Sequence, residues 1–527
     1  MLSSLLMTGA VLWVSWRIWK FTVLPKIYPN EPKQLPYWIP VIGHVYGMLM
    51  DSNKLFTYGR KYFGNTREIF MVTVMGEELY IATSAQDVSS IYKASKAFDF
   101  NAIINDIFEG FGITASTMQK MYEPNWDQGK HWIDIIHEIF KEQMHLGEKL
   151  VELQTTFLRK IDDCLFWDRL SGAMVLSEPS NHVKVVSAYK WTYEVLVSAA
   201  SKSFFGNAIL DANPDLLKDF LIFDTEAWKM LLKYPPFAAK EMFDAKAKCE
   251  AAFERYLTLP VEKREDATWL VRNIETAMKG LGIPDDQTAV MHFILYRLIN
   301  TNAYRTCFWS LSHLLQDQAL QDSIMRETKP AFSSDGKLSM THLLDHCPLL
   351  NSFYEEVVRE TTYPIGARVV VNEITIGNTV LHPGKKVLMP FQQMHSNPDV
   401  FGKNAAEFDP TRFLNNPSLS KSTSYRPFGT GLTYCPGRFL ARREIFMFLV
   451  PVLHRFDLKV EGREDRGHAV FPRMDDSISS GGVMGPRKGD DLVLQHALTN
   501  PKDRSYEVTN LMGRSRMDTG LLFTSCQ

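Results

Sequence analysis

The sequence predicts a mainly α-helical protein with a minor β part, built as a single large domain behind an N-terminal transmembrane helix. Helical spacing of apolar residues dominates residues 130–330. Short alternating stretches on either side of that region are typical of strands. At 527 residues two domains would be the default expectation, but we find no repeat and no linker that divides the body.

The composition excludes several classes of function. Lys and Arg total 58 against 60 Asp and Glu, which argues against a general nucleic-acid-binding protein. The six cysteines are far apart and none forms a C-x-x-C pair. This pattern fits neither a disulfide framework nor a zinc site, and it favours a reducing compartment.

Residues 1–24 are predicted to be a retained membrane anchor. Leu2 to Trp16 carry no charge. The apolar run reaches the roughly 20 residues that cross a bilayer only if Arg17 and Lys20 extend their charges to the interface. Basic residues after the run place the body on the cytosolic side by the positive-inside rule. The localisation expected is the endoplasmic reticulum membrane, with a single pass. An interfacial helix lying on the membrane is the alternative.

The body is expected to begin after a stiff connector, residues 25–40, whose five prolines cannot continue a helix. Alternating stretches around Gly76 predict a hairpin, and Ser84 is suited to start the helix that follows. One long helix from about Asp286 to Gln316, of modest polarity, is expected to run through the centre of the domain.

The C-terminal part has a mixed pattern. A helix after Leu349 is followed by short strands separated by turn residues, and residues 391–427 are irregular. Apolar periodicity ends near residue 495, so 496–527 are predicted to be a loosely attached tail.

The stretch from Arg426 to Arg443 carries the strongest chemical signal. Gly429 and Gly431 lie in a turn-rich approach to Cys435, and an apolar helix starts at about Arg438. A thiolate there would face backbone N–H groups at the helix start, whose partial positive charge favours an anion. A lone cysteine is usually just a small buried residue, so its surroundings decide.

Those surroundings match a known pattern. Phe428, Gly431, Cys435 and Gly437 stand at the spacing F-x-x-G-x-x-x-C-x-G, which resembles the heme-thiolate loop of the cytochrome P-450 family. Three further features resemble that family: the E-x-x-R pair Glu356 and Arg359, the FDPTRF segment that contains Arg412, and the proline-rich connector behind an anchor. The resemblance implies the cytochrome P-450 fold, with residues 41–495 as the heme domain.

The resemblance also implies the cofactor and its ligand. Heme b would bind with Cys435 as the axial ligand of its iron, against a loop that includes Phe428, Gly429 and Gly437. A cysteinate pushes electron density onto the iron and favours O–O cleavage. In the family Glu356, Arg359 and Arg412 correspond to a buried brace beneath this loop.

Two basic residues resemble the family's contacts to the heme propionates. Arg368 lies on the first strand after the E-x-x-R helix. Trp126-x-x-x-Lys130 resembles W-x-x-x-R with lysine in place of arginine, and neighbouring His131 is the competing candidate. Thr433 stands where many relatives carry arginine or histidine, so one charged contact is expected to be lost or supplied elsewhere.

The central helix departs from the family pattern. Leu298–Asn302 stand at the signature A-G-x-[DE]-T, and asparagine replaces its threonine, as in the branch of sterol 7α-hydroxylases and prostacyclin synthase. The resemblance assigns Asn300, Thr301 and Asn302 to the catalytic oxygen side. These side chains can hold water, although none is a strong acid. Simple hydrogen bonding between helices is the alternative.

Three functional hypotheses follow. A monooxygenase would use O2 and electrons from NADPH, delivered by a reductase. Basic residues such as Lys130, Arg442 and Arg443 are expected to attract the acidic surface of that reductase. An isomerase or dehydratase acting on a peroxide would need no reductase, and a heme sensor or carrier would have no catalysis. The substrate expected is a lipophilic terpenoid, steroid or polyketide-like molecule that enters past Phe98–Phe111. The segment CPGRFLARREI resembles the same segment of filamentous-fungal relatives, many of which act in secondary metabolism.

Overall fold

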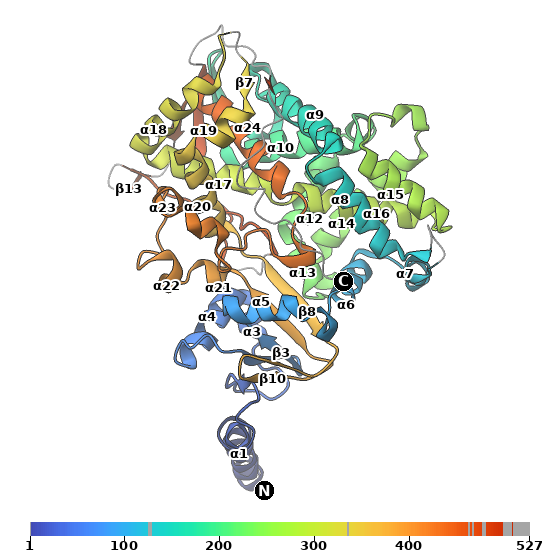
Figure 1. Ribbon diagram of the computed structural model, residues 1–527, viewed down its shortest axis with the longest axis vertical. Coiled ribbons are helices and arrows are strands. Elements are labelled where there is room, and N and C mark those ends of the chain that lie inside the picture. Colours follow the sequence, from blue (N-terminus) through green and yellow to red (C-terminus); the bar gives the residue numbers. More distant parts are fainter. Residues whose placement is uncertain are drawn as a thin grey trace.

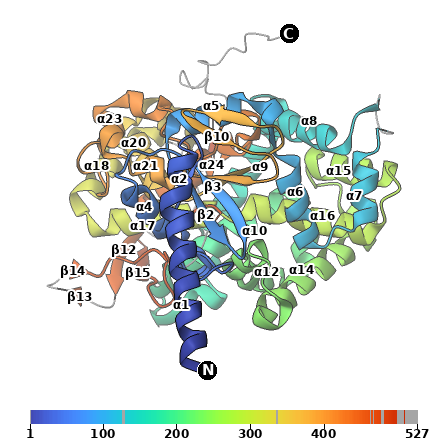
Figure 2. The ribbon, with the colours of Figure 1, turned by 90° about the horizontal axis from the view of Figure 1, so that it is seen from below.

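The N-terminal helix projects from the β-rich end of the molecule, away from the helical body (Figures 1 and 2). The computed structural model describes residues 2–124, 129–334, 337–461, 464–465, 468–476, 481–498 and 508–509. Helix α1 (Leu2–Ile18) continues into a π-helical turn (Trp19–Val23) and helix α2 (Leu24–Ile27). Within these ranges, no helix combines the length and the apolar character that crossing a membrane requires.

The start of the predicted connector differs from expectation. Pro25 lies inside α2, at its first turn, instead of ending the helical segment. The helical segment therefore continues past Pro25 although proline has no N–H to donate to the preceding turn. The extended connector therefore begins only after Ile27.

The larger sheet lies next to the N-terminal segment. Its strand order is β1 (Lys33–Gln34), β2 (Phe70–Val74), β3 (Glu77–Ile81), β11 (Lys386–Pro390), β8 (Ile365–Val370) and β4 (Phe98–Asp99). The predicted hairpin is confirmed: β2 and β3 pair antiparallel, and Gly76 takes a φ of 84° in the turn between them. The predicted start of α5 (Ala85–Lys93) is also confirmed, because Ser84 Oγ accepts hydrogen bonds from the N–H groups of Gln86 and Asp87. Strand β8 places Arg368 next to Val387.

Helices fill the rest of the molecule and give the fold its mainly α character (Figure 1). Short helices flank the sheet and the irregular segment after it: α3 (Val45–Met50), α4 (Ser52–Tyr62), α6 (Asn101–Phe111), α21 (Gln392–His395), α22 (Pro398–Phe401) and α23 (Arg412–Asn415). The helical body contains α7 (Ala115–Tyr122), α8 (Trp132–Met144), α9 (Glu148–Cys164), α10 (Ala188–Phe205), α11 (Ala208–Asp211), α12 (Leu216–Glu226), α13 (Trp228–Leu231), α14 (Lys240–Thr258), α15 (Trp269–Gly280), α16 (Asp285–Asn300), α17 (Ala303–Gln316), α18 (Gln318–Thr328), α19 (Met340–His346), α20 (Pro348–Thr361) and α24 (Arg438–Arg455).

A continuous apolar core unites this helical body. One cluster of buried side chains runs from Phe108 to Leu494 and includes most of α10, α16, α17 and α24. A second cluster lies between the larger sheet and α5, and a third lies beneath α4. One core therefore spans segments from both halves of the chain, and the domain bounds given by the sequence stay a prediction.

The smaller sheets join distant parts of the chain. The order β12 (Phe456–Glu461), β15 (Val493–Leu498), β6 (Val183–Ser187), β5 (Val175–Ser180) connects the C-terminal part with the segment before α10. Further short pairs are β9 (Ile374–Ile376) with β10 (Thr379–Leu381), β13 (Glu464–Asp465) with β14 (His468–Ala469), and β7 (Leu338–Ser339) with β16 (Val508–Thr509). Residues 496–498 therefore belong to a sheet of the body and not to the tail, while most of the later residues lie outside the described ranges.

Candidate active site

The loop that leads to Cys435 is fixed by its own backbone. Gly429 and Gly431 take φ values of 78° and 65°, which other residues rarely adopt. The Cys435 N–H donates to the carbonyl oxygen of Phe428 at 3.0 Å, and α24 begins three residues later at Arg438. Cys435 itself is exposed. The loop thus presents its sulfur at the start of a long buried helix, as the sequence predicts.

Two opposing effects act on the sulfur. Although the residue is exposed by surface area, protein packed around it desolvates the thiol and raises its pKa, while backbone N–H groups of Gly437 and Arg438 act in the opposite direction. A Cβ added at Gly437 would lie 3.6 Å from Cys435 Sγ, so the helix start is close to the sulfur. A thiol with a raised pKa becomes a stable thiolate where a cation faces it, which suits a metal ligand.

A buried ion-pair network lies behind the loop. Glu356 on α20 is fully buried and accepts from Arg359 Nη2 at 2.7 Å and from Arg412 Nε at 3.1 Å. It also accepts the backbone N–H of Asp409 at 2.9 Å. Arg412 donates in addition to the carbonyl oxygens of Asn404 and Glu407. The contacts expected of Glu356, Arg359 and Arg412 are therefore present.

This network reaches the thiolate loop through one histidine. Arg359 Nη1 donates to the carbonyl oxygen of His395 at 2.9 Å, and His395 Nε2 accepts the backbone N–H of Arg426 at 3.0 Å. Burial lowers the pKa of His395 to about 3, so the ring is neutral and its Nε2 can act as an acceptor. Arg426 starts the loop, and the ion pairs therefore position its first residue.

The central helix is not the continuous element that the sequence predicts. Helix α16 ends at Asn300 and α17 begins at Ala303, and Asn302 between them has φ −107° and ψ −39°. The break lies within the proposed oxygen-side residues. Of the two residues between the helices, Thr301 is bound to the side chain of Asp224 and Asn302 to the backbone N–H of Val483.

The three candidate catalytic side chains bind three different partners. Asn300 Nδ2 donates to the carbonyl oxygen of Tyr296 at 3.0 Å, and its buried Oδ1 has no hydrogen-bond partner among the residues that the structure describes. Thr301 Oγ1 donates to Asp224 Oδ1 at 2.8 Å. Asn302 is exposed, and its Oδ1 accepts the backbone N–H of Val483 at 2.9 Å. Successive residues near a helix point about 100° apart, so adjacent positions do not make a common cluster. Of the three, Asn302 is the exposed one.

Comparison with known proteins agrees with this geometry. Residues 302–471, which include Asn302, the buried network and Cys435, match the cytochrome P-450 family. Cytochrome P-450 monooxygenase poxD from Penicillium oxalicum is 24% identical over 456 residues, 84% of this chain and 90% of that protein. The 7-alpha-hydroxycholest-4-en-3-one 12-alpha-hydroxylase of Homo sapiens is 25% identical over 467 residues, 82% of this chain and 87% of that protein. Cytochrome P-450 7A1 of Oryctolagus cuniculus is 21% identical over 510 residues, 91% of this chain and 96% of that protein.

The chain is therefore similar to the cytochrome P-450 family, through residues 302–471 and through relatives that are matched along most of its length. The relatives' names describe oxidoreductases of the monooxygenase type, and the matched family implies a heme iron cofactor. The hydroxylase of Homo sapiens and cytochrome P-450 7A1 agree with the resemblance of its central helix to the sterol hydroxylase branch.

The residues around Cys435 fit the heme that this similarity implies. Arg368 is buried, and its Nη2 donates to Thr433 Oγ1 at 2.9 Å. Its guanidinium lies 4.6 Å from the centre of the Tyr92 ring and 4.3 Å from that of Phe100. Among the described residues no carboxylate lies within ion-pair distance of Arg368, and burial lowers its pKa. A buried, uncompensated cation beside the loop is suited to a propionate.

The second predicted propionate contact has a protein partner. Lys130 Nζ lies 2.9 Å from Glu138 on α8, and His131 is exposed just before that helix. Trp126, the other half of the predicted motif, lies outside the described residues. A propionate would have to compete with Glu138 for Lys130, so this assignment stays a prediction.

Two of the basic residues expected to attract a reductase are not free surface charges. Arg443 is buried, and Arg442 forms an ion pair with Glu355 and a 3.3 Å hydrogen bond with Asn351 Oδ1. Helix α24 turns both side chains toward its neighbours because the helix is packed on most of its circumference. Arg443 is therefore not a surface charge, whereas attraction of a reductase by the partly exposed Arg442 stays a prediction.

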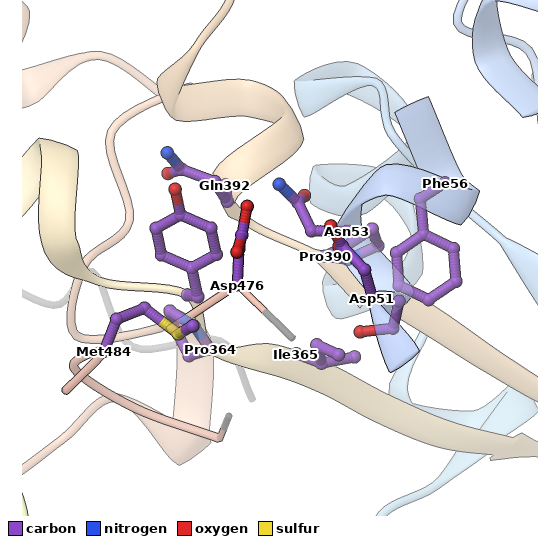
Figure 3. A pocket seen from close by; sticks show the side chains of 11 residues that line it. Asp51, Asn53, Phe56, Pro364, Ile365, Pro390, Gln392, Asp476 and Met484 are labelled. Atoms are coloured by element: carbon purple, nitrogen blue, oxygen red, sulfur yellow. The ribbon is translucent and has the colours of Figure 1, made fainter. Parts of the chain in front are cut away.

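A small cavity is lined by residues other than the candidate site residues (Figure 3). Its volume of about 20 Å³ accommodates roughly one water molecule, which is too little for a lipophilic substrate. Asp51 and Asp476 face it from separate segments, with Gln392 and Met484 nearby. Met484 adjoins Val483, the partner of Asn302, so the cavity borders the segment that contacts the central helix.

Asp224 and Arg305 are structural partners that sequence reasoning missed. Arg305 donates to Asp224 Oδ2 at 2.7 Å inside the helical body. Asp224 in α12 and Arg305 in α17 are far apart along the chain, and no sequence motif links an acidic and a basic residue at that distance. Only the charge of Arg305, in a helix that contains no other Lys, Arg, Asp or Glu, could have drawn attention to it.

Proposed function

We propose that this protein is a cytochrome P-450 that contains heme b and inserts one atom of O2 into a lipophilic small molecule, with electrons from NADPH delivered by a reductase. The observation that carries the proposal is the placement of Cys435 at the start of α24, beside the uncompensated guanidinium of Arg368. The monooxygenase and hydroxylase names of the relatives support this class of reaction.

The heme supplies the oxidising chemistry when it is bound, and the residues of the chain control how it is held. Cys435 offers a sulfur whose negative charge is favoured by the nearby backbone N–H groups of Gly437 and Arg438. Arg368 offers a cation for a propionate. The network around Glu356 holds the start of the loop through His395, which keeps the sulfur in place.

On the opposite side, Asn302 offers a hydrogen-bond donor but no strong acid. Its Oδ1 is bound to Val483, so the Nδ2 group is available to orient a water molecule. Asn300 and Thr301 serve this side indirectly, through bonds inside the helical body. Proton delivery in this protein would then rely on ordered water and not on a carboxylic acid at the family's usual position.

The substrate class proposed is a steroid- or terpenoid-sized lipophilic molecule made or modified in secondary metabolism. The name of the human relative describes hydroxylation of a steroid ketone, and a fungal monooxygenase is among the matched relatives. Helix α6 offers apolar side chains such as Ile104 and Ile107, which are partly buried at the position predicted for substrate entry.

We further propose that the N-terminal segment anchors the protein in the endoplasmic reticulum membrane, with the domain facing the cytosol. Leu6, Met7, Val11 and Leu12 on α1 are exposed apolar residues. Trp13 stacks on Trp38, with 5.6 Å between ring centres, which attaches α1 to the body. A protein lacking residues 2–24 should leave the membrane fraction. Unchanged sedimentation with membranes would contradict the anchor.

Metabolite profiling of cells that express the protein or its Cys435→Ala variant tests the reaction. The wild-type protein should give the absorption band of a thiolate-ligated heme with carbon monoxide and an oxygenated product that requires NADPH and a reductase. The variant should lose both. Rapid turnover of a lipid hydroperoxide without NADPH would instead indicate the isomerase or dehydratase. A thiolate-type band without any oxidised product would indicate a sensor or carrier.

A further inference from the structure

A short segment, residues 482–484, is attached to the central helix by side chains on one face of it. Asn302 Oδ1 accepts the Val483 N–H at 2.9 Å, and Trp309 Nε1 donates to the carbonyl oxygen of Met484 at 2.6 Å. On its other side, Tyr363 donates its N–H to the carbonyl oxygen of Gly482 at 2.9 Å. The segment therefore links the central helix to the chain that follows α20.

Val483 is held at both of its backbone groups. Its N–H is bound by Asn302, and its carbonyl oxygen accepts a hydrogen bond from Arg305 Nη1 at 3.2 Å. Asn302 and Arg305 are three residues apart and lie on the same face of the helix. Arg305 thus acts on the peptide that follows Val483, next to the peptide whose N–H binds Asn302, and the backbone of Thr361 holds the same segment through the Met484 N–H at 2.9 Å.

Asp224 on α12 compensates the charge of Arg305. Its carboxylate is fully buried and accepts from Arg305 Nη2 at 2.7 Å. The same carboxylate accepts from Thr301 Oγ1 at 2.8 Å and from Tyr304 Oη at 2.9 Å. Its donors come from the break itself, at Thr301, and from the first turn of α17, so one carboxylate ties the break to the helix that follows it.

The orientation of the Asn302 amide follows from these contacts. A backbone N–H can bind only the oxygen of a carboxamide, so Val483 decides which branch is Oδ1. The Nδ2 group occupies the other branch, directed away from Val483. A Cβ at residue 482 would lie 2.2 Å from Oδ1, so glycine at this position lets the amide approach. Asn302 remains exposed, while Thr301 is buried against Asp224.

We propose that Asp224 is a positioning residue for the oxygen side of the site: through Arg305 it fixes the Val483 peptide, and that peptide fixes the donor group of Asn302. The inference rests on the proposed function, because it assumes that Asn302 lies on the side where O2 binds. It adds a residue from α12, far from the thiolate loop in sequence, to those that set the reaction outcome.

The test uses carbon monoxide as the probe, in the holoenzyme. The infrared C–O stretching band of the reduced carbon monoxide complex responds to a hydrogen-bond donor near the bound molecule. Asn302→Leu should shift this band. Asp224→Asn should shift or split it in the same direction, and Asp224→Asn added to Asn302→Leu should cause no further change. Asp219→Asn, on the same helix and bonded to Lys248 instead, is the matched control and should leave the band in place.

A second variant separates positioning from folding. Asp224→Asn leaves Arg305 buried without its partner and can lower stability, whereas Asp224→Asn combined with Arg305→Met removes both charges. The double variant should recover stability yet still show the shifted band and release more peroxide per NADPH consumed, because the Val483 carbonyl remains unbound.

The outcomes are distinguishable. An unchanged band in both Asp224 variants, with a shift in Asn302→Leu, would overturn the role of Asp224. An unchanged band in Asn302→Leu would overturn the inference from its first step. In either case the thiolate-type absorption and the NADPH-dependent product would still support the proposed function, and loss of those two signals in the wild-type protein would contradict the function itself.

Discussion

Replacing Glu356 by glutamine should destabilise the protein strongly while hardly changing its shape. Glu356 is fully buried and accepts two hydrogen bonds from Arg359, at 2.8 and 2.7 Å, and two from Arg412, both at 3.1 Å. Glutamine retains one acceptor oxygen and directs an NH2 group toward the guanidinium groups. Two buried arginines would then lack their shared counter-charge.

The magnitude follows from the burial of the network. Removing one partner of a buried ion pair costs about 3–5 kcal/mol, because the other charge stays buried and uncompensated. A loss of about 4 kcal/mol corresponds to roughly a thousandfold change in the unfolding equilibrium constant. Against a total of about 5–15 kcal/mol for a typical domain, this is a large share.

Urea unfolding followed by tryptophan fluorescence and circular dichroism would measure this loss. Glu138→Gln is the matched control, because it removes a carboxylate from the exposed ion pair with Lys130. Exposed pairs contribute about 0–1 kcal/mol, so the control should unfold close to the wild-type midpoint. A loss below about 1 kcal/mol for Glu356→Gln, or equal losses for the two variants, would refute the reasoning.

Three more predictions follow from single contacts. Gly482→Ala should destabilise the protein by about 1–3 kcal/mol because the new Cβ would meet Asn302 Oδ1, whereas a Cβ at residue 481 would have no atom within 4 Å. Thermal denaturation of Gly482→Ala and Gly481→Ala compares the two, and equal melting temperatures would contradict the packing argument. The pKa of His395 falls from 6.5 to about 3 on folding, so the contribution of this neutral ring to the free energy of unfolding is complete above pH 6.5 and is lost as the pH falls toward 3. About 2 kcal/mol should be lost by pH 5, and the drop in stability between pH 7 and 5 should be smaller in His395→Asn. Arg368→Met should transfer heme to apomyoglobin at least about tenfold faster than the wild-type protein, because a hydrogen bond to a charged group contributes about 1.5–3 kcal/mol. Thr433→Val, which removes only the hydroxyl bound to Arg368, is the control, and equal transfer rates of the two variants would argue against a propionate contact.

The sequence by itself determined the elements whose cause is local. The spacing of Phe428, Gly431, Cys435 and Gly437 encodes a loop that closes on its own backbone, and the structure contains that loop. Glu356 and Arg359 are one helical turn apart, so their contact needs little beyond a helix. The hairpin around Gly76 likewise depends on neighbouring residues. These features share short separations along the chain.

The tertiary structure alone decided the oxygen side of the site. The sequence predicts one unbroken helix there, because periodicity records which residues are apolar and not which distant groups bind the backbone. The break at Thr301 and Asn302 involves Asp224, 77 residues from Thr301, and Val483, 178 residues from Arg305. Burial gives these contacts their strength, since a charged or polar group inside the body must find a partner wherever the fold brings one. The loop around Cys435 could therefore be predicted from neighbouring residues in the sequence, whereas the environment of Asn302 depended on how α12, the central helix and residues 482–484 pack together.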